Sequence, residues 1–482
     1  MNHDTLDWGT ELSAFDYMMF RSDMNTKSRT TIMQIETLDV VPDWDRLRTE
    51  LDRTSRIALR LRQRVVAPVV PLTPARWVVD PDFDLDYHVR RIQLPGSTSL
   101  RQLLDFAQTM FHDPLDPNRP LWEMVLVEGL DDDGAKAAMV WKLSHATIDG
   151  VGGAVLDELI RSEVREPGPR TMPPLPIPED LTSMELTQRA VKRLPLRLVG
   201  SAVRRGRSVA GLGVRAVRDP AGLAGQVTRM VSSARHTLSP ESEPSPLLRG
   251  RSLQRRFDTH VLALQDLRKA ARAHGCSMND GYLAALAGAM RLYHDALGVP
   301  IESITCGMPI NVRADSDPAG GNQWSAATLA LPVSEADPVR RMQSIRERVI
   351  TARSDAGLNL MALVSPVMTW LPLSLLSGLG GGSLGIDIQA SNVPGSPVAR
   401  YIAGARILRS IPIGPLPGVA MMATMVSQNG RLHLGLNVDP AAFTDHELLM
   451  SSIRAGFDEV LAAAPAEPTT PAKRPRKPRK RT

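Results

Sequence analysis

The amino-acid sequence predicts an α/β fold divided between two domains. The chain has 482 residues, whereas a single hydrophobic core rarely grows beyond about 250–300 residues. Mixed strand and helix patterns run from Leu12 to Ile160 and again from Ser252 to Leu461. A proline-rich segment from Glu166 to Pro178 separates them, and such a composition is typical of a connector. Two α/β units joined by a crossover are therefore expected.

The first domain contains a predicted strand–turn–strand unit. Trp122–Val127 and Ala135–Leu143 are apolar runs, and the acidic, glycine-containing segment Asp131–Gly134 separates them. A glycine-rich segment that begins at Gly150 is expected to start a helix. His145 lies between the second strand and this helix, so a tight turn is expected to present its side chain at the end of a buried strand.

The second domain combines helical and strand patterns. Apolar residues recur at helical spacing over Asp266–Gly275 and Asn279–Leu297. Four further segments have strand character: Ser303–Ile310, Ser325–Leu331, Ala420–Ser427 and Leu432–Asn437. This alternation predicts a second α/β unit, with no repeat at a fixed period.

The composition is that of a globular protein, with 43% hydrophobic and 23% charged residues. The net charge of +5 depends on the C-terminal tail, because removing the seven Lys and Arg residues of the last ten positions leaves −2. The basic charge is thus local, and no nucleic-acid partner is expected. The two cysteines, Cys276 and Cys306, have no metal-like spacing, so we expect reduced thiols and no metal site.

Membrane contact is expected to be peripheral. The N-terminus has no basic region followed by an apolar core, and no apolar run reaches the ~18 residues of a spanning helix. Between Met184 and Arg235 nearly all charges are basic and alternate with Leu, Val and Ala. Such a segment can form cationic amphipathic helices at a membrane interface. Glycines interrupt it at Gly200, Gly206, Gly211 and Gly213 and weaken helices, so a solvated linker is the alternative.

His145 is the strongest candidate for a catalytic residue. The sequence around it is Leu143-Ser144-His145-Ala146-Thr147-Ile148-Asp149-Gly150. Histidine titrates near neutral pH, so it can remove a proton from an alcohol with little help from its surroundings. A satisfied core histidine is the alternative. Asp149 follows four residues later, but the two side chains on a turn need not face each other.

This stretch resembles the HHxxxDG signature of the CoA-dependent acyltransferases, and of the bacterial wax ester synthase/diacylglycerol acyltransferase family in particular. Five further stretches resemble that family in the same order: Arg119–Trp122, Met278–Asp280, Met308–Arg313 with Gly321-Asn322, Ser391–Gly395 and Gly435–Asp439. The chain departs from the family at Ser144, which stands where the first histidine of the signature is expected.

The resemblance implies two chloramphenicol acetyltransferase-like domains with an active-site tunnel at their interface. We expect an N-terminal domain over residues 1–180, a basic crossover over 181–250, a C-terminal domain over 251–465 and a disordered basic tail over 466–482. Two roles are open for the tail: a solubilising segment, or a tether to anionic lipids, since each basic residue near such a surface adds about 1 kcal/mol.

The resemblance also assigns roles to single residues. His145 is the general base, whereas Asp149 is structural and pairs with Arg313 to hold the turn before Gly150. Asn279 and Asn392 are candidate donors to the oxyanion of the tetrahedral intermediate. Each also has a structural interpretation, because Asn279 could cap its helix and Asn392 could shape a Pro-Gly turn.

The implied function is acyl transfer from acyl-CoA, as a co-substrate, to diacylglycerol, or to a fatty alcohol with a wax ester as the product. No bound cofactor is implied. We expect a cytoplasmic enzyme at the inner membrane or on lipid droplets. Two alternatives stay open. One is an acyltransferase that takes its acyl group from a carrier protein to build an envelope lipid. The other is a catalytically silent lipid-binding relative, which the serine at position 144 motivates.

Overall fold

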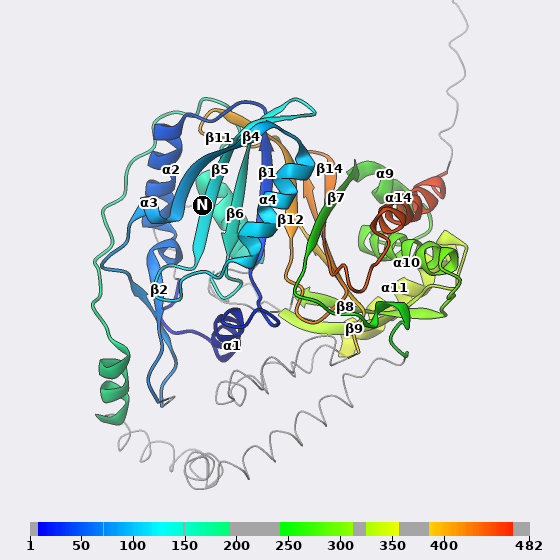
Figure 1. Ribbon diagram of the computed structural model, residues 1–482, viewed down its shortest axis with the longest axis horizontal. Coiled ribbons are helices and arrows are strands. Elements are labelled where there is room, and N and C mark those ends of the chain that lie inside the picture. The colour runs from blue at the N-terminus through cyan, green and yellow to red at the C-terminus, as the bar shows by residue number, and fades with distance from the viewer. Residues whose placement is uncertain are drawn as a thin grey trace, which may run out of the picture.

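The structure is a computed structural model that describes residues 8–70, 72–147, 150–192, 242–311, 324–355 and 385–465. Two six-stranded sheets form the two halves of the molecule, and helices pack on both (Figure 1). This arrangement confirms the α/β fold class expected from the sequence. Of the expected basic crossover, residues 181–250, the structure describes 181–192, with a helical stretch at 183–192, and 242–250. The expected tail lies wholly outside the described residues.

The first sheet has the strand order β11-β12-β1-β6-β5-β4. Its strands are β1 (Ile32–Leu38), β4 (Val89–Thr98), β5 (Trp122–Asp132), β6 (Ala135–Leu143), β11 (Tyr401–Ile402) and β12 (Ala405–Ile413). The helices of this half are α1 (Ala14–Asp23), α2 (Trp44–Ile57), α3 (Leu85–His88), α4 (Leu100–His112) and α5 (Gly150–Ile160). A small sheet of β2 (Gln63–Val66) and β3 (Arg76–Val79) follows the 3-10 turn Leu59–Arg62.

The central parts of β5 and β6 are apolar because both faces of the sheet are covered. Met124 and Leu126 pack with residues of α2 and α5 on one face. Val125 and Val127 pack with residues of α4 on the other. The predicted hairpin is confirmed, although β5 continues to Asp132. Its turn uses positive φ angles at Asp133 and Gly134, as a two-residue hairpin turn requires.

The second sheet has the strand order β7-β14-β13-β10-β8-β9. Its strands are β7 (Arg256–Ala263), β8 (Ser303–Asn311), β9 (Trp324–Pro332), β10 (Ile388–Val393), β13 (Met421–Gln428) and β14 (Arg431–Val438). The helices that pack against it are α9 (Leu264–Ala273), α10 (Met278–Ala296), α11 (Pro338–Asp355) and α14 (His446–Ala462). A 3-10 turn at Leu247–Arg249 leads into this half. Cys276 and Cys306 are both buried and form no disulfide.

Strand β12 belongs to the C-terminal part of the chain but completes the first sheet. It pairs antiparallel with β1 from Met33↔Ile413 to Leu38↔Ile407, and its orange ribbon lies among the blue and cyan strands in Figure 1. At the junction of the halves, a Cβ atom on Gly435 of β14 would lie 1.8 Å from the Pro412 carbonyl oxygen of β12. The close approach of these two strands therefore requires glycine at this position.

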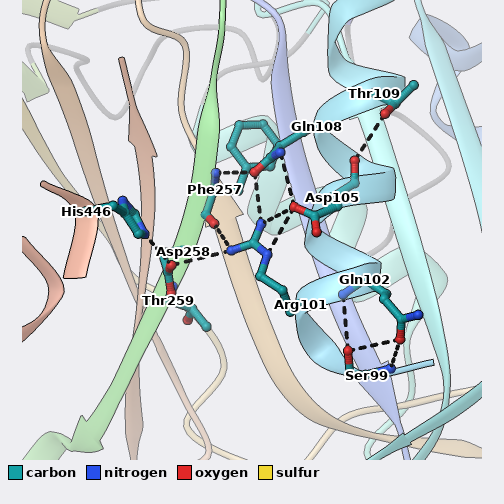
Figure 2. Close-up of polar contacts among 10 residues, drawn as sticks. All are labelled: Ser99, Arg101, Gln102, Asp105, Gln108, Thr109, Phe257, Asp258, Thr259 and His446. Atoms are coloured by element: carbon teal, nitrogen blue, oxygen red, sulfur yellow. Dashed lines mark hydrogen bonds and ion pairs between the residues drawn. The ribbon is translucent and has the colours of Figure 1, made fainter. Parts of the chain in front are cut away.

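A second connection between the halves covers the free edge of β7. The Phe257 N–H donates to Oε1 of Gln108 at 2.6 Å, and Nη1 of Arg101 donates to the Phe257 carbonyl at 2.7 Å (Figure 2). Arg101 also lies 3.4 Å from Asp258, which His446 contacts at 2.8 Å from its other side. Two side chains of α4 thus satisfy the backbone of an edge strand that would otherwise be exposed or unpaired.

These contacts also change the acidity of Asp258. Burial opposes its ionisation, but the hydrogen bonds from His446 and the Thr259 N–H, with the charge of Arg101, outweigh burial. The pKa of Asp258 is therefore lower than its ordinary value, and the carboxylate stays charged at the junction.

Replacing Gln108 by alanine should destabilise the protein by about 1–3 kcal/mol, since the N–H of the fully buried Phe257 loses its acceptor. The free energy of unfolding from denaturant titration measures this loss. Thr109→Ala on the same helix is the matched control and should stay within about 0.5 kcal/mol of the wild type. Equal stability of the two variants would contradict the assigned role of Gln108.

A buried histidine of the first half should make stability depend on pH. His88 is 1% exposed, its Nδ1 donates to the Trp122 carbonyl at 2.8 Å, and burial lowers its pKa to about 4. In the unfolded chain this histidine takes up a proton near pH 6.5, whereas in the folded chain it stays neutral down to about pH 4. The stability that the neutral histidine contributes is therefore fully present above pH 6.5 and is lost as the pH falls toward 4. The change from 6.5 to about 4 corresponds to about 3 kcal/mol.

The measurement is the unfolding free energy of the wild type and His88→Gln at pH 7 and pH 4. The variant lacks the titrating group, so the stability advantage of the wild type should shrink by about 3 kcal/mol at pH 4. An advantage that is constant across this range would show that His88 does not stay neutral in the folded protein.

Candidate active site

His145 lies directly beyond the end of the central strand β6. This strand pairs with β1 on one side and with β5 on the other, and its residues are almost all buried. The Ser144 N–H donates to the Leu121 carbonyl at 3.0 Å, and the Thr147 N–H donates back to the Ser144 carbonyl at 3.0 Å. His145 is half-buried between two buried neighbours, Ser144 and Ala146. The chain turns there, as the sequence predicts.

A half-buried aspartate at the end of α1 holds Ser144. The Ser144 hydroxyl donates to Oδ2 of Asp23 at 2.5 Å and accepts from the Ala146 N–H at 3.2 Å. The other oxygen of Asp23 accepts from the N–H and hydroxyl of Thr30 at 2.7 and 2.9 Å. Burial raises the pKa of Asp23, although these hydrogen bonds favour its charged form. The serine that replaces the expected histidine is thus tied to both sides of the turn around His145.

A buried lysine fixes the same end of β6 to α4. Lys142 is fully buried, and its ammonium donates to the carbonyls of Met110 at 3.0 Å and Asp113 at 3.2 Å. Its Nζ lies 3.3 Å from Oε2 of Glu123 on β5. Burial lowers the pKa of Lys142, and the negative charge of Glu123 opposes this effect. The ammonium also meets the carbonyl end of α4, where a cation is favourable.

The segment Arg119–Trp122 supports the turn from the neighbouring strand. Leu121 accepts the Ser144 N–H described above, and Trp122 is buried with its Nε1–H bonded to the Leu61 carbonyl at 2.8 Å. The Trp122 ring stacks on His88 with a centroid distance of 4.7 Å. The resemblance includes this segment, and its contacts support the residues before His145.

Asp149 and Arg313 lie outside the described residues, so their expected pairing is not observed. Gly150 is the first residue of α5, where the sequence predicts the start of a helix. Among the described residues, no group of three or more His, Cys, Asp or Glu side chains could hold a metal ion.

Asn279 is not the cap of its helix. The N-cap of α10 is Ser277, whose hydroxyl accepts from the Asp280 N–H while the Asp280 side chain accepts from the Ser277 N–H. This capping box satisfies two N-terminal donors of the helix, and the sequence analysis overlooked it. Asn279 is the second helical residue, and its Nδ2 lies 3.6 Å from the sulfur of Met308 on β8.

Asn392 lies within a strand rather than in a turn. It is opposite Met425 in the parallel β10–β13 pair, and the Pro-Gly segment follows only after β10 ends at Val393. The turn-shaping interpretation is therefore wrong. Strand β10 also runs parallel to β8. Asn392 on β10 and Met308 on β8, which Asn279 contacts, therefore both lie toward the carboxyl ends of neighbouring strands.

The structure thus places the candidate residues on both halves. His145 is at the end of β6 in the first half, whereas Asn279 on α10 and Asn392 on β10 belong to the second half. Asp23 and Lys142 hold the turn of His145, and sequence reasoning missed both. Asp23 is 121 positions from Ser144, and no sequence spacing relates them. Lys142 could have been noticed as a charge inside an otherwise apolar strand.

None of the helices in the described part of the chain is long and apolar enough to cross a membrane.

Two family models match the chain. The wax ester synthase/diacylglycerol acyltransferase catalytic domain matches residues 8–282, and the C-terminal domain of the same family matches residues 320–460. A provisionally named diacylglycerol O-acyltransferase of Mycobacterium tuberculosis is 45% identical over 96% of this chain and 94% of its own length. Another one from that organism is 30% identical over 75% of this chain and 78% of its own length.

Solved structures show the same fold. The wax ester synthase/diacylglycerol acyltransferase from Marinobacter aquaeolei VT8 aligns with a TM-score of 0.62 at 21% identity, over 94% of this chain and all of that one. The first condensation domain of the calcium-dependent antibiotic synthetase aligns with a TM-score of 0.58 at 16% identity, over 95% and 98% of the two chains. The chain therefore belongs to the wax ester synthase/diacylglycerol acyltransferase family.

Proposed function

We propose that this protein is an O-acyltransferase that moves a long-chain acyl group from acyl-CoA to diacylglycerol, with fatty alcohols as further acceptors. The observation that carries this proposal is the position of His145 at a fixed turn beyond β6, in a chain of this family. The names of the relatives at 45% and 30% identity support diacylglycerol as the acceptor.

His145 acts as the general base in the proposed reaction. Its imidazole removes the hydroxyl proton of the acceptor while the oxygen attacks the thioester carbonyl carbon. As the tetrahedral intermediate collapses, the new C–O ester bond stays and the C–S bond breaks. The CoA thiolate leaves and takes the proton back from His145, which is favourable because a free thiol has a pKa of ~8.5. This sequence needs neither a metal ion nor a covalent acyl-enzyme.

Residues of both halves support the proposed transition state. Asn279 on α10 and Asn392 on β10 are the proposed donors to the oxyanion. One such donor contributes roughly 2.7–4 kcal/mol. Asp149 and Arg313 are proposed to pair and hold the turn on the far side of His145. Asp23 and Ser144 hold its near side.

We further propose that the enzyme works in the cytoplasm at the surface of the inner membrane or of lipid droplets, because its acceptor is a lipid. The basic crossover and the seven basic residues between Lys473 and Arg481 supply positive charge for contact with anionic headgroups.

Replacing His145 by alanine should lower turnover at least about 100-fold, since general-base catalysis contributes 10²–10⁴-fold. The assay follows labelled acyl-CoA, with diacylglycerol and a long-chain alcohol offered in parallel to the purified protein. His274→Ala on the remote side of the C-terminal half is the matched control and should keep its activity. Wild-type protein that forms neither triacylglycerol nor wax ester would favour a carrier-protein donor or a silent lipid binder.

Replacing Asp23 by asparagine should lower kcat about tenfold with little change in KM. The side chain keeps its size but loses the charge that holds Ser144, and a tenfold rate change corresponds to about 1.4 kcal/mol. Asp86→Asn, at a mostly exposed carboxylate on α3, is the control. A merely structural role for Asp23 would lower the melting temperature and leave kcat of the folded protein unchanged.

A further inference from the structure

A pocket lined by basic side chains lies at the junction of the two halves. Its lining comes from the first half through Thr26, Arg29, Phe111 and His112, and from the second half through Leu253, Arg255 and Leu416. No carboxylate is among these described residues. The enclosed part of the pocket is only about 10 Å³, room for about one water molecule, and the rest opens to solvent. It therefore suits the end group of a ligand that reaches it from solvent, and not a whole ligand.

Both guanidinium groups donate to backbone carbonyl oxygens, and nearby carboxylates, Asp23 and Asp113 at Arg29 and Asp439 at Arg255, offset part of their charge. Arg29 donates through Nη1 to the His112 carbonyl at 2.7 Å and through Nε to the Asp23 carbonyl at 3.3 Å. Arg255 donates through Nη1 to the carbonyls of Ser252 at 3.1 Å and Gln254 at 2.7 Å. Each guanidinium has five N–H groups, so these contacts fix its position and leave further donors for a ligand.

The nearest carboxylate to Arg255 is already engaged. Oδ2 of Asp439 lies 3.9 Å from Nη1 of Arg255, at the outer limit of an ion pair. Both carboxylate oxygens of Asp439 accept from Ser252, at 2.7 Å from its N–H and 2.7 Å from its hydroxyl. Asp439 therefore acts on Arg255 through its charge, without a direct hydrogen bond.

The pKa of His112 reflects the same two positive charges. Partial burial lowers its pKa, the positive charges of Arg255 and Arg29 lower it further, and Asp113 opposes them. Burial likewise lowers the pKa of Arg255; the charge of Asp439 opposes this effect, and the charge of Arg29 adds to it. Like charges that face one cavity repel each other, and a bound anion would relieve this repulsion.

Structural roles explain only part of this arrangement. Arg29 caps the carbonyl end of α4, and Arg255 ties down the segment before β7. Neither role requires that two arginines and a histidine, from opposite halves of the molecule, line one cavity. The floor of that cavity is apolar, because Phe111 and Leu416 are buried.

The pocket is connected to the turn of His145 by one residue. Asp23 accepts from Arg29 through its backbone carbonyl and from Ser144 through its carboxylate. Of the substrates in the proposed reaction, only acyl-CoA carries phosphate groups, whereas diacylglycerol and fatty alcohols are uncharged. Arginine forks suit phosphate oxygens, with which they form short, charge-assisted hydrogen bonds.

We infer that the pocket of Arg29, His112 and Arg255 binds a phosphate group of the acyl-CoA donor and so positions the coenzyme at the domain junction. This inference rests on the proposed function, since that function supplies the donor. A phospholipid headgroup carries the same chemistry, and the experiment below separates the two sources.

The test compares two donors with the same acyl chain, acyl-CoA and the acyl thioester of N-acetylcysteamine, which has no phosphate. Arg255→Gln should raise KM for acyl-CoA about tenfold, because a hydrogen bond to a charged group contributes about 1.5–3 kcal/mol. KM for the phosphate-free thioester and kcat should stay unchanged. Arg255→Lys should restore part of the affinity. Arg91→Gln, on the exposed face of the edge strand β4, is the matched control.

His112→Glu keeps the test decisive if Arg255→Gln fails to fold, because His112 is exposed and a new negative charge there leaves the core intact. This variant should also raise KM for acyl-CoA alone. Unchanged KM for acyl-CoA in both variants, with turnover intact, would overturn the pocket and leave the proposed function standing.

Binding of free CoA, measured by calorimetry, separates the pocket from the reaction. If the protein catalyses no transfer but Arg255→Gln and His112→Glu still weaken CoA binding, the proposed function fails and the pocket stands. The last arm of the experiment measures binding of the variants to vesicles of anionic phospholipid. Variants that lose vesicle binding but keep CoA binding would assign the pocket to lipid headgroups and overturn the inference.

Discussion

The pairing of β12 with β1 is the constraint on which the two-domain arrangement depends. A strand from the C-terminal part of the chain hydrogen-bonds along the outer edge of β1 and so closes the N-terminal sheet on that side. The same strand passes so close to β14 that position 435 has no room for a side chain. Neither half can shift without breaking backbone hydrogen bonds, and β6, which carries His145 at its end, lies next to β1.

Because the junction is fixed, it can hold charged groups in positions that are shielded from water. Lys142 is fully buried, yet carbonyls of the α4 end and the carboxylate of Glu123 surround its ammonium. Asp23 is likewise satisfied by Thr30 and Ser144. Breaking one side of such a buried arrangement costs more than the pair contributes, because a buried charge is left uncompensated. The turn of His145 is thus held by groups that cannot relax independently.

Local features of this fold could be predicted from the sequence, and long-range ones could not. The β5–β6 hairpin and the strand before His145 follow from apolar runs and an acidic glycine turn. The cap of α10 was misassigned because Ser277 and Asp280 satisfy the helix start together, which leaves Asn279 free to face β8. Neither the pairing of β12 with β1 nor the contact of Asp23 with Ser144 has a local signal, since their partners meet only in the folded chain.

The charges at the junction act differently on the two substrates of the proposed reaction. Outside its tail the chain has a net charge of −2, so a cluster of two arginines and a histidine is a local feature rather than part of a basic surface. An anionic donor is attracted to such a cluster, whereas an uncharged lipid acceptor is not. Arg29 and Ser144 both donate to Asp23, so a single residue separates this cluster from the turn of His145.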